Sequence, residues 1–113
     1  MPPLGIHHVS LNVSDVDAAL AFYTGALGLT VREDRPDFGF GGAWLDAGGQ
    51  QIHLIGAPTP DNLGQHLALQ VADLDTTVAE LRAQGIDVPD PSPVGPGRQF
   101  FLVHQFGNAV ELS

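Results

Sequence analysis

Short runs in which apolar and polar residues alternate, separated by stretches of helical periodicity, predict the elements of this chain. Within residues 6–13, valine and leucine occupy every second position, as in a half-buried strand. Apolar residues then return every three or four positions, which predicts a helix that Ser14 caps and that Gly25 or Gly28 ends. After a further strand over 29–33, a loop over 35–42 leads to two strands joined by a Gly48-Gly49 turn, over 43–46 and 51–55.

The second half of the chain repeats this order after a linker over 57–65 that is rich in proline and other turn residues. We expect a strand over 66–71, a helix over about 73–83, a strand around 86–88, a loop over 89–97 and strands over 99–104 and 109–112. Each half therefore reads as strand, helix, strand, strand, strand.

The two halves also repeat in sequence, with an offset of 58 positions. His8-Val9-Ser10-Leu11-Asn12-Val13 aligns with His66-Leu67-Ala68-Leu69-Gln70-Val71, and Gln51-Ile52-His53-Leu54 aligns with Ala109-Val110-Glu111-Leu112. The repeat predicts an α+β fold of two βαβββ modules, about 4–56 and 66–113, with curved, half-barrel mixed sheets. Because half of 113 residues is too small to be stable alone, we expect a single domain, 1–113, whose modules share a core or exchange partners.

The repeat places a metal-capable side chain at two equivalent points of each module: His8, His53, His66 and Glu111. In each strand their neighbours are apolar and expected to face the helices, so these four side chains point to the opposite, concave face. Any one of them alone would more often have a structural role. Together, three imidazoles and a carboxylate suit a divalent first-row ion (Zn, Ni, Co, Mn or Fe), with coordination positions left for substrate.

The amino-acid composition limits the classes of molecule that the protein can bind. The chain has thirteen acidic residues against four arginines and no lysine, a formal charge of −9, which argues against nucleic acid or an anionic membrane surface. The acidic balance favours solubility or a cationic ligand. Cysteine is absent, so thiolate ligands and disulfides are excluded. No apolar run is long enough to span a bilayer and no signal peptide is evident, so a cytoplasmic protein is expected.

Further residues are candidates for substrate contact. Arg98 follows a Gly-Pro-Gly loop and can hold an anionic group, although a surface role is the more common one. His7 has the parity of the helix face and is assigned a structural role. His104 shares the repeat position of Asp46 and is a possible substrate contact. Aromatic side chains supply apolar surface for a pocket or for the core: Phe38, Phe40, Trp44, Phe100 and Phe101.

Several segments resemble the vicinal oxygen chelate superfamily of glyoxalase I, methylmalonyl-CoA epimerase, fosfomycin-resistance proteins, extradiol dioxygenases and bleomycin-resistance proteins. They are Ile6-His7-His8-Val9-Ser10-Leu11-Asn12-Val13, Ala21-Phe22-Tyr23-Thr24-Gly25-Ala26-Leu27-Gly28-Leu29, Gln51-Ile52-His53-Leu54-Ile55, His66-Leu67-Ala68-Leu69-Gln70-Val71 and Gly107-Asn108-Ala109-Val110-Glu111-Leu112. The resemblance implies glyoxalase-like paired modules, a homodimer and a metal in the concavity. A site within one subunit and a site shared by two subunits, with modules exchanged, both remain open.

Carried over position by position, the resemblance selects the same four ligands as the repeat. Three departures bear on function. Glyoxalases usually have Glu where this chain has His53. The family's Asp-Pro-Asp-Gly-Asn turn is replaced by His104-Gln105-Phe106-Gly107-Asn108. No basic cluster for glutathione carboxylates is evident.

The leading hypothesis is a metal-dependent lyase or isomerase that acts on a small substrate with two neighbouring oxygens, through an enediolate. Glu111 is the candidate general base, with His53 or a hydroxide on the ion as the fallback. An Fe(II) extradiol-type dioxygenase using His8, His66 and Glu111 is the second hypothesis, which a fourth ligand at His53 disfavours. A fosfomycin-type thiol transferase and a metal-free binder of bleomycin-type antibiotics complete the alternatives.

Overall fold

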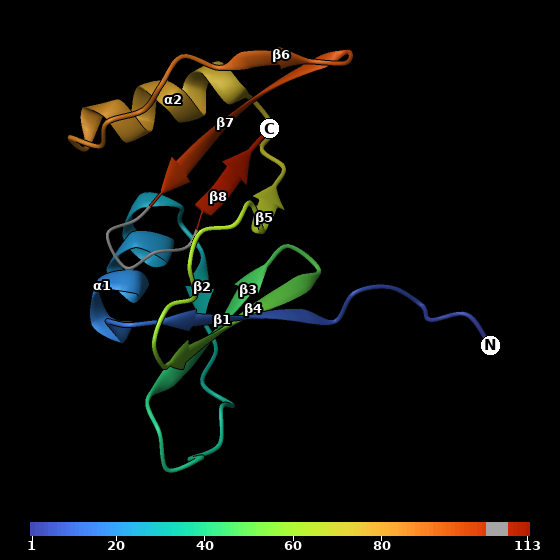
Figure 1. Ribbon diagram of the computed structural model, residues 1–113, viewed down its shortest axis with the longest axis vertical. Helices are drawn as coiled ribbons and strands as arrows, with labels where there is room; N and C mark the ends of the chain where they lie inside the picture. The colour runs from blue at the N-terminus through green and yellow to red at the C-terminus, as the bar shows by residue number, and fades with distance from the viewer. Residues whose placement is uncertain (104–108) are drawn as a thin grey trace. The chain divides into compact units, whose positions relative to one another are not determined.

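The computed structural model describes residues 1–103 and 109–113, which form two compact units, Met1–Pro60 and Asp61–Ser113 (Figure 1). Each unit contains one four-stranded mixed sheet together with helical residues, in the chain order expected for a βαβββ module. The predicted α+β class and the two-module architecture are therefore confirmed.

The first unit is built on a sheet of order β1-β4-β3-β2. β1 is parallel to β4, while β3 pairs antiparallel with both β4 and β2. Its elements are β1 (His8–Val13), α1 (Val16–Leu20), the π-helical turn η1 (Ala21–Ala26), β2 (Thr30–Val31), β3 (Gly42–Ala47) and β4 (Gln50–Gly56).

Alternation along the strands separates a core face from a second face. Leu45 on β3 and Ile52 and Leu54 on β4 are almost fully buried, as are Ala19 of α1 and Tyr23 of η1. α1 packs against β3 and β4, so these apolar side chains form the core between helix and sheet. Burying a Leu or Ile side chain contributes roughly 1.5–3 kcal/mol, so this row holds the helix on the sheet.

Both α-helices begin at an aspartate of the repeat. Asp15 and Asp73 have extended backbones and accept hydrogen bonds from the amides of Ala18 and Thr76, each at 3.0 Å. The prediction that Ser14 caps the first helix is therefore wrong by one residue, because Asp15 provides the acceptor three positions before an unpaired amide.

The second unit has the equivalent sheet order, β5-β8-β7-β6, with β5 parallel to β8. Its core comprises Val78 and Leu81 of the helix and inward residues of the last two strands, among them Leu102 and Val110. The elements are β5 (His66–Leu69), α2 (Leu74–Ala83), β6 (Ser92–Val94), β7 (Gly97–Val103) and β8 (Ala109–Leu112).

The predicted strand around 86–88 is not formed. Val88 is buried, but its carbonyl accepts from the Arg82 guanidinium, with Nη2 at 2.8 Å, instead of joining a ladder. The adjacent Pro89 lacks an amide donor. The second strand of the module is instead β6, inside the predicted loop over 89–97, where Gly95 has a φ of +54° and closes the hairpin to β7.

The longest helix in the described residues, α2, has ten residues, and no described helix combines the length and apolarity needed to cross a membrane.

Replacing Asp73 with alanine should lower the free energy of unfolding by about 1 kcal/mol, since α2 loses its N-terminal acceptor. Urea denaturation at neutral pH measures this difference. Asp87→Ala, at an exposed position after the helix, is the matched control and should change stability by less than about 0.5 kcal/mol. Equal losses in the two variants would show that the cap does not stabilise the helix.

Candidate functional site

In the first unit, two histidines and the tryptophan form a column of stacked rings. Parallel pairing sets Ser10 of β1 beside His53 of β4, which puts His8, two residues earlier, on the same face. The His8 and His53 ring centroids lie 4.0 Å apart with planes 12° from parallel. Trp44, directly across from His53 on β3, covers the ring at 4.4 Å and 11°. His53 is consequently only 8% exposed.

One ring nitrogen of His53 forms a hydrogen bond with the side-chain amide of Gln51. Its Nε2 lies 2.8 Å from the side-chain oxygen of Gln51, and an amide oxygen can only accept. The neutral ring therefore donates through Nε2 and keeps the lone pair on Nδ1. This arrangement, in which one imidazole nitrogen is held by a hydrogen bond and the other carries a lone pair, is the usual state of a metal-ligating histidine.

Burial lowers the pKa of His53 below its usual value, and the adjacent His8 and His7 lower it further. A charged imidazole is disfavoured where water is excluded, and a second positive ring nearby adds repulsion. His53 is thus held neutral at physiological pH, the form in which it can donate an electron pair.

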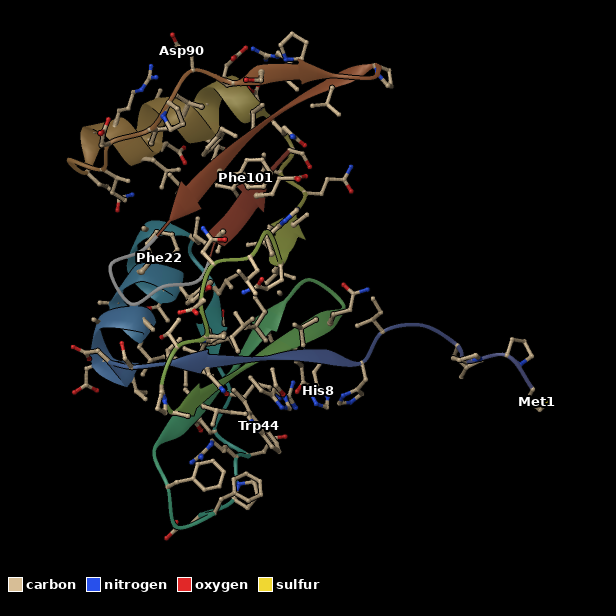
Figure 2. All side chains as sticks on the ribbon, in the orientation of Figure 1. Met1, His8, Phe22, Trp44, Asp90 and Phe101 are labelled. Carbon is tan, nitrogen blue, oxygen red and sulfur yellow. The ribbon has the colours of Figure 1, made fainter. Side chains whose placement is uncertain are left out.

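A cavity of about 380 Å³ opens beside this column. Figure 2 labels two of its lining residues, His8 and Trp44, on the same side of β1. Phe38 stacks on Phe40 at 5.6 Å and lies 6.1 Å from Trp44, so three of the predicted substrate residues come together with His8 and His53. The lining comprises His7, His8, Ser10, Arg35, Phe38, Phe40, Trp44, His53, Leu54 and Ile55.

The assignment of His7 to the helix side is wrong. His7 precedes β1, so strand alternation does not apply to it, and it is exposed and lines the cavity. Its Nδ1 lies 2.9 Å from Nδ1 of His8. In this contact one ring nitrogen donates and the other accepts, so the tautomers of His7 and His8 depend on each other.

The second unit brings together the other two predicted ligands, in the same register. β5 pairs with β8 so that Ala68 lies beside Glu111, and His66 is again two residues earlier. His66 Nε2 lies 3.2 Å from Glu111 Oε1. The ring of Phe101 packs against His66, with the two rings nearly perpendicular and their centroids 4.9 Å apart. Glu111 is largely shielded, with a side chain 16% exposed.

The hydrogen bonds of His66 show which of its nitrogens can face an ion shared with Glu111. His66 Nδ1 lies 2.9 Å from the carbonyl oxygen of Gly64, which can only accept, so Nδ1 carries a proton. In the neutral ring, Nε2 then presents a lone pair to a carboxylate oxygen. That contact is favourable only if a proton or a metal ion lies between the two atoms, so the donor chemistry fits a divalent ion.

Each unit by itself brings together one pair of the predicted ligands. Within neither unit, over the described residues, do three His, Asp or Glu side chains converge as a ligand set for one ion. The set of three imidazole nitrogens and one carboxylate oxygen predicted from the sequence therefore requires both pairs.

Phe100, predicted for a pocket or for the core, lies in the core, and it is Phe101 that contacts His66. Phe100 is 3% exposed and pairs with Leu112 on the core face, whereas Phe101 pairs with Glu111. The β7–β8 hairpin is offset by one residue from its β3–β4 counterpart. As a result, Val103 is paired as Asp46 is in the first unit. His104 itself lies outside the described residues.

Arg98 lies on β7 and is joined to α2 by an ion pair with Asp75, at 3.0 Å. The bond from Arg98 holds the pKa of the Asp75 carboxyl below its usual range. Its charge is therefore matched within the protein. The sequence argument missed Arg35, which lines the first unit's cavity; its place in a loop with Phe38 and Phe40 was the available signal.

Comparison with known proteins identifies the family. The model of the Glyoxalase/Bleomycin resistance protein/Dioxygenase superfamily matches residues 5–112. The chain belongs to this superfamily. The match spans both units.

Three relatives illustrate the range within the superfamily. Glyoxylase I 4 of Arabidopsis thaliana is 31% identical over 91 residues, 73% of this chain, and the match covers about half (52%) of that protein. An antibiotic binding protein from Streptomyces, TnmS3, is 27% identical with a TM-score of 0.81, covering 100% of this chain and 97% of the other. Lactoylglutathione lyase from Agrobacterium tumefaciens (23% identity, TM-score 0.77, 99% and 94% covered) shares the fold.

In the metal-free protein, His53 should titrate below about 6.5, the ordinary value for histidine. His8→Gln should raise the pKa of His53 part of the way, because the main cause, burial, remains. NMR titration of the imidazole signals measures both values. Since the unfolded chain then binds the proton more readily, stability should fall as pH drops below about 6.5. A pKa at or above the ordinary value would contradict the buried column.

Proposed function

We propose that this superfamily member is a divalent-metal enzyme of the glyoxalase-like type, a lyase or isomerase for a small substrate with two neighbouring oxygens. The observation that carries the proposal is the pair of equivalent contacts, His8 with His53 and His66 with Glu111, at the same register of each module. Structural requirements alone give no reason to place ligand-type side chains at both points of both modules.

His8, His53, His66 and Glu111 would hold the ion, with both pairs contributed by one chain or by two copies. When bound, a first-row ion would supply Lewis acidity toward the substrate oxygens. The three neutral imidazoles leave a single negative ligand, so the site would keep most of the ion's positive charge. A homodimer is the expected assembly, and the cytoplasm is the expected location.

Glu111 is the proposed general base. Its contact with His66 uses Oε1, which orients the carboxylate and leaves Oε2 to take a proton from the carbon next to a carbonyl. Burial lowers the pKa of His53, and its Nε2 is hydrogen-bonded to Gln51, which leaves Nδ1 as its free nitrogen. Its role is to hold the ion, and Trp44 shields its ring from water.

A second candidate is a metal-free binder of an antibiotic. The aromatic lining of the first unit's cavity and the 27% identity to the antibiotic binding protein favour it. Such a binder has no use for the His66–Glu111 pair, so metal content distinguishes the two: the proposed enzyme contains about one ion per chain after purification, and the binder contains none.

Glu111→Gln should lower the rate of proton transfer by about 10²–10⁴-fold, because the amide cannot accept the proton. The protein should retain much of its metal through the three histidines. The measurement is deuterium incorporation from D₂O at the carbon next to the carbonyl of S-lactoylglutathione and of simple hydroxyketones, followed by NMR, with metal content determined on the same samples.

Glu80→Gln on the exposed face of α2 is the matched control and should exchange at the wild-type rate. Undiminished exchange in Glu111→Gln would remove Glu111 as the base. Absence of metal from the wild-type protein, even after incubation with Zn²⁺, Ni²⁺, Co²⁺, Mn²⁺ and Fe²⁺, would remove the enzymatic proposal.

A further inference from the structure

The four arginines of this acidic chain differ in whether a carboxylate forms an ion pair with them. Arg32 contacts Asp34 and Asp46, at 2.8 and 2.7 Å, Arg82 contacts Asp90 at 3.0 Å, and Arg98 contacts Asp75 at 3.0 Å. Within the described residues, Arg35 has no carboxylate within ion-pair distance. It is also the arginine that lines the cavity beside His8 and His53.

Aromatic rings hold the Arg35 side chain in place. Its guanidinium carbon lies 5.1 Å from the ring centre of Phe38 and 5.5 Å from that of Phe40, and its Nη2 donates to the Phe40 carbonyl at 3.0 Å. Guanidinium groups stack on aromatic faces and keep their edge donors for a planar acceptor. One backbone bond uses a small part of the five N–H donors.

We propose that this cavity binds a small aromatic anion, with its carboxylate on Arg35 and its ring against Trp44 and Phe38. As a statement about the substrate, this rests on the proposed function. As a statement about binding, it rests on the cavity alone. The net charge of −9 favours a cationic ligand for the protein as a whole. In this cavity, however, the guanidinium of Arg35 has no carboxylate partner and therefore favours an anion.

The shape and lining of the cavity support an aromatic ligand. About 380 Å³ is at the lower end of the range for small-molecule sites, enough for one substituted ring. Phe38 and Phe40 are 49% and 50% exposed, an uncommon state for two adjacent stacked rings and one that a flat apolar ligand would relieve.

Trp44 is the single tryptophan of the chain and lines the cavity, so its fluorescence reports on this site directly. The metal-free protein is titrated with three probes of one shape and different charge: phenylacetate, phenylacetamide and phenylethylammonium. Phenylacetate should bind at least about tenfold more tightly than phenylacetamide, since a charge-assisted bond replaces a neutral one. Phenylethylammonium should bind most weakly.

Arg35→Gln should bring the affinities for phenylacetate and phenylacetamide to within about threefold of each other, and Arg35→Lys should retain a preference for the anion. Arg98→Gln is the matched control: it removes an arginine of the other unit and should leave the wild-type preference. Metal content should be the same in all four proteins, because Arg35 is not a ligand.

The wild-type comparison of the three probes needs no variant, so it tests the proposal even if Arg35→Gln fails to fold. No preference for phenylacetate, preference for the ammonium probe, no saturable binding, or an anion preference that survives Arg35→Gln would overturn it. Metal binding with no anion preference would refute this inference alone. Anion preference without any metal binding would refute the proposed function alone.

Discussion

The parallel pairing of the first and last strand of each module is the constraint on which the site depends. In both units the register places the ligand position of the last strand beside the residue two positions after the histidine of the first strand. Side chains on one face of a parallel pair at this spacing come into contact. A shift of one residue in either pairing would turn His53 or Glu111 toward the core.

The same register produces two chemically different pairs. In the first unit, Trp44 and His8 sandwich His53, which lowers its pKa through burial and like charge. In the second unit, the Glu111 carboxylate lies 3.2 Å from His66 Nε2, and the two groups can share a proton or a metal ion. One pair thus offers neutral nitrogen donors and the other supplies the negative charge. Together they match the preferences of a first-row divalent ion.

Much of the fold could be predicted because the repeat, with its offset of 58 positions, and the alternation within each strand are both visible in the sequence. They gave the α+β class, the module order and the equivalent positions of His8, His53, His66 and Glu111 on the face opposite the helices. Ring stacking and the Arg35 contacts depend on side chains of different strands and loops, so no periodicity encodes them. The four-ligand metal set itself stays a prediction.

The errors have equally specific causes. By sequence, Phe100 and Phe101 could each serve a pocket or the core, and the pairing of β7 with β8 assigns Phe100 to the core face. His7 was assigned by alternation although it lies before the strand begins. The strand expected around Val88 is absent because Arg82 takes its carbonyl. For His7 and Val88, a prediction from the pattern of neighbouring residues failed because contacts elsewhere in the fold determine the structure there.

The central claim is that both pairs bind a single ion, and X-ray absorption spectroscopy of the protein loaded with one equivalent of Zn²⁺ tests it most directly. Multiple scattering from imidazole rings counts the histidine ligands. The account predicts three imidazoles and a carboxylate oxygen around the metal. Two imidazoles or fewer, or an ion that the protein does not retain, would contradict it.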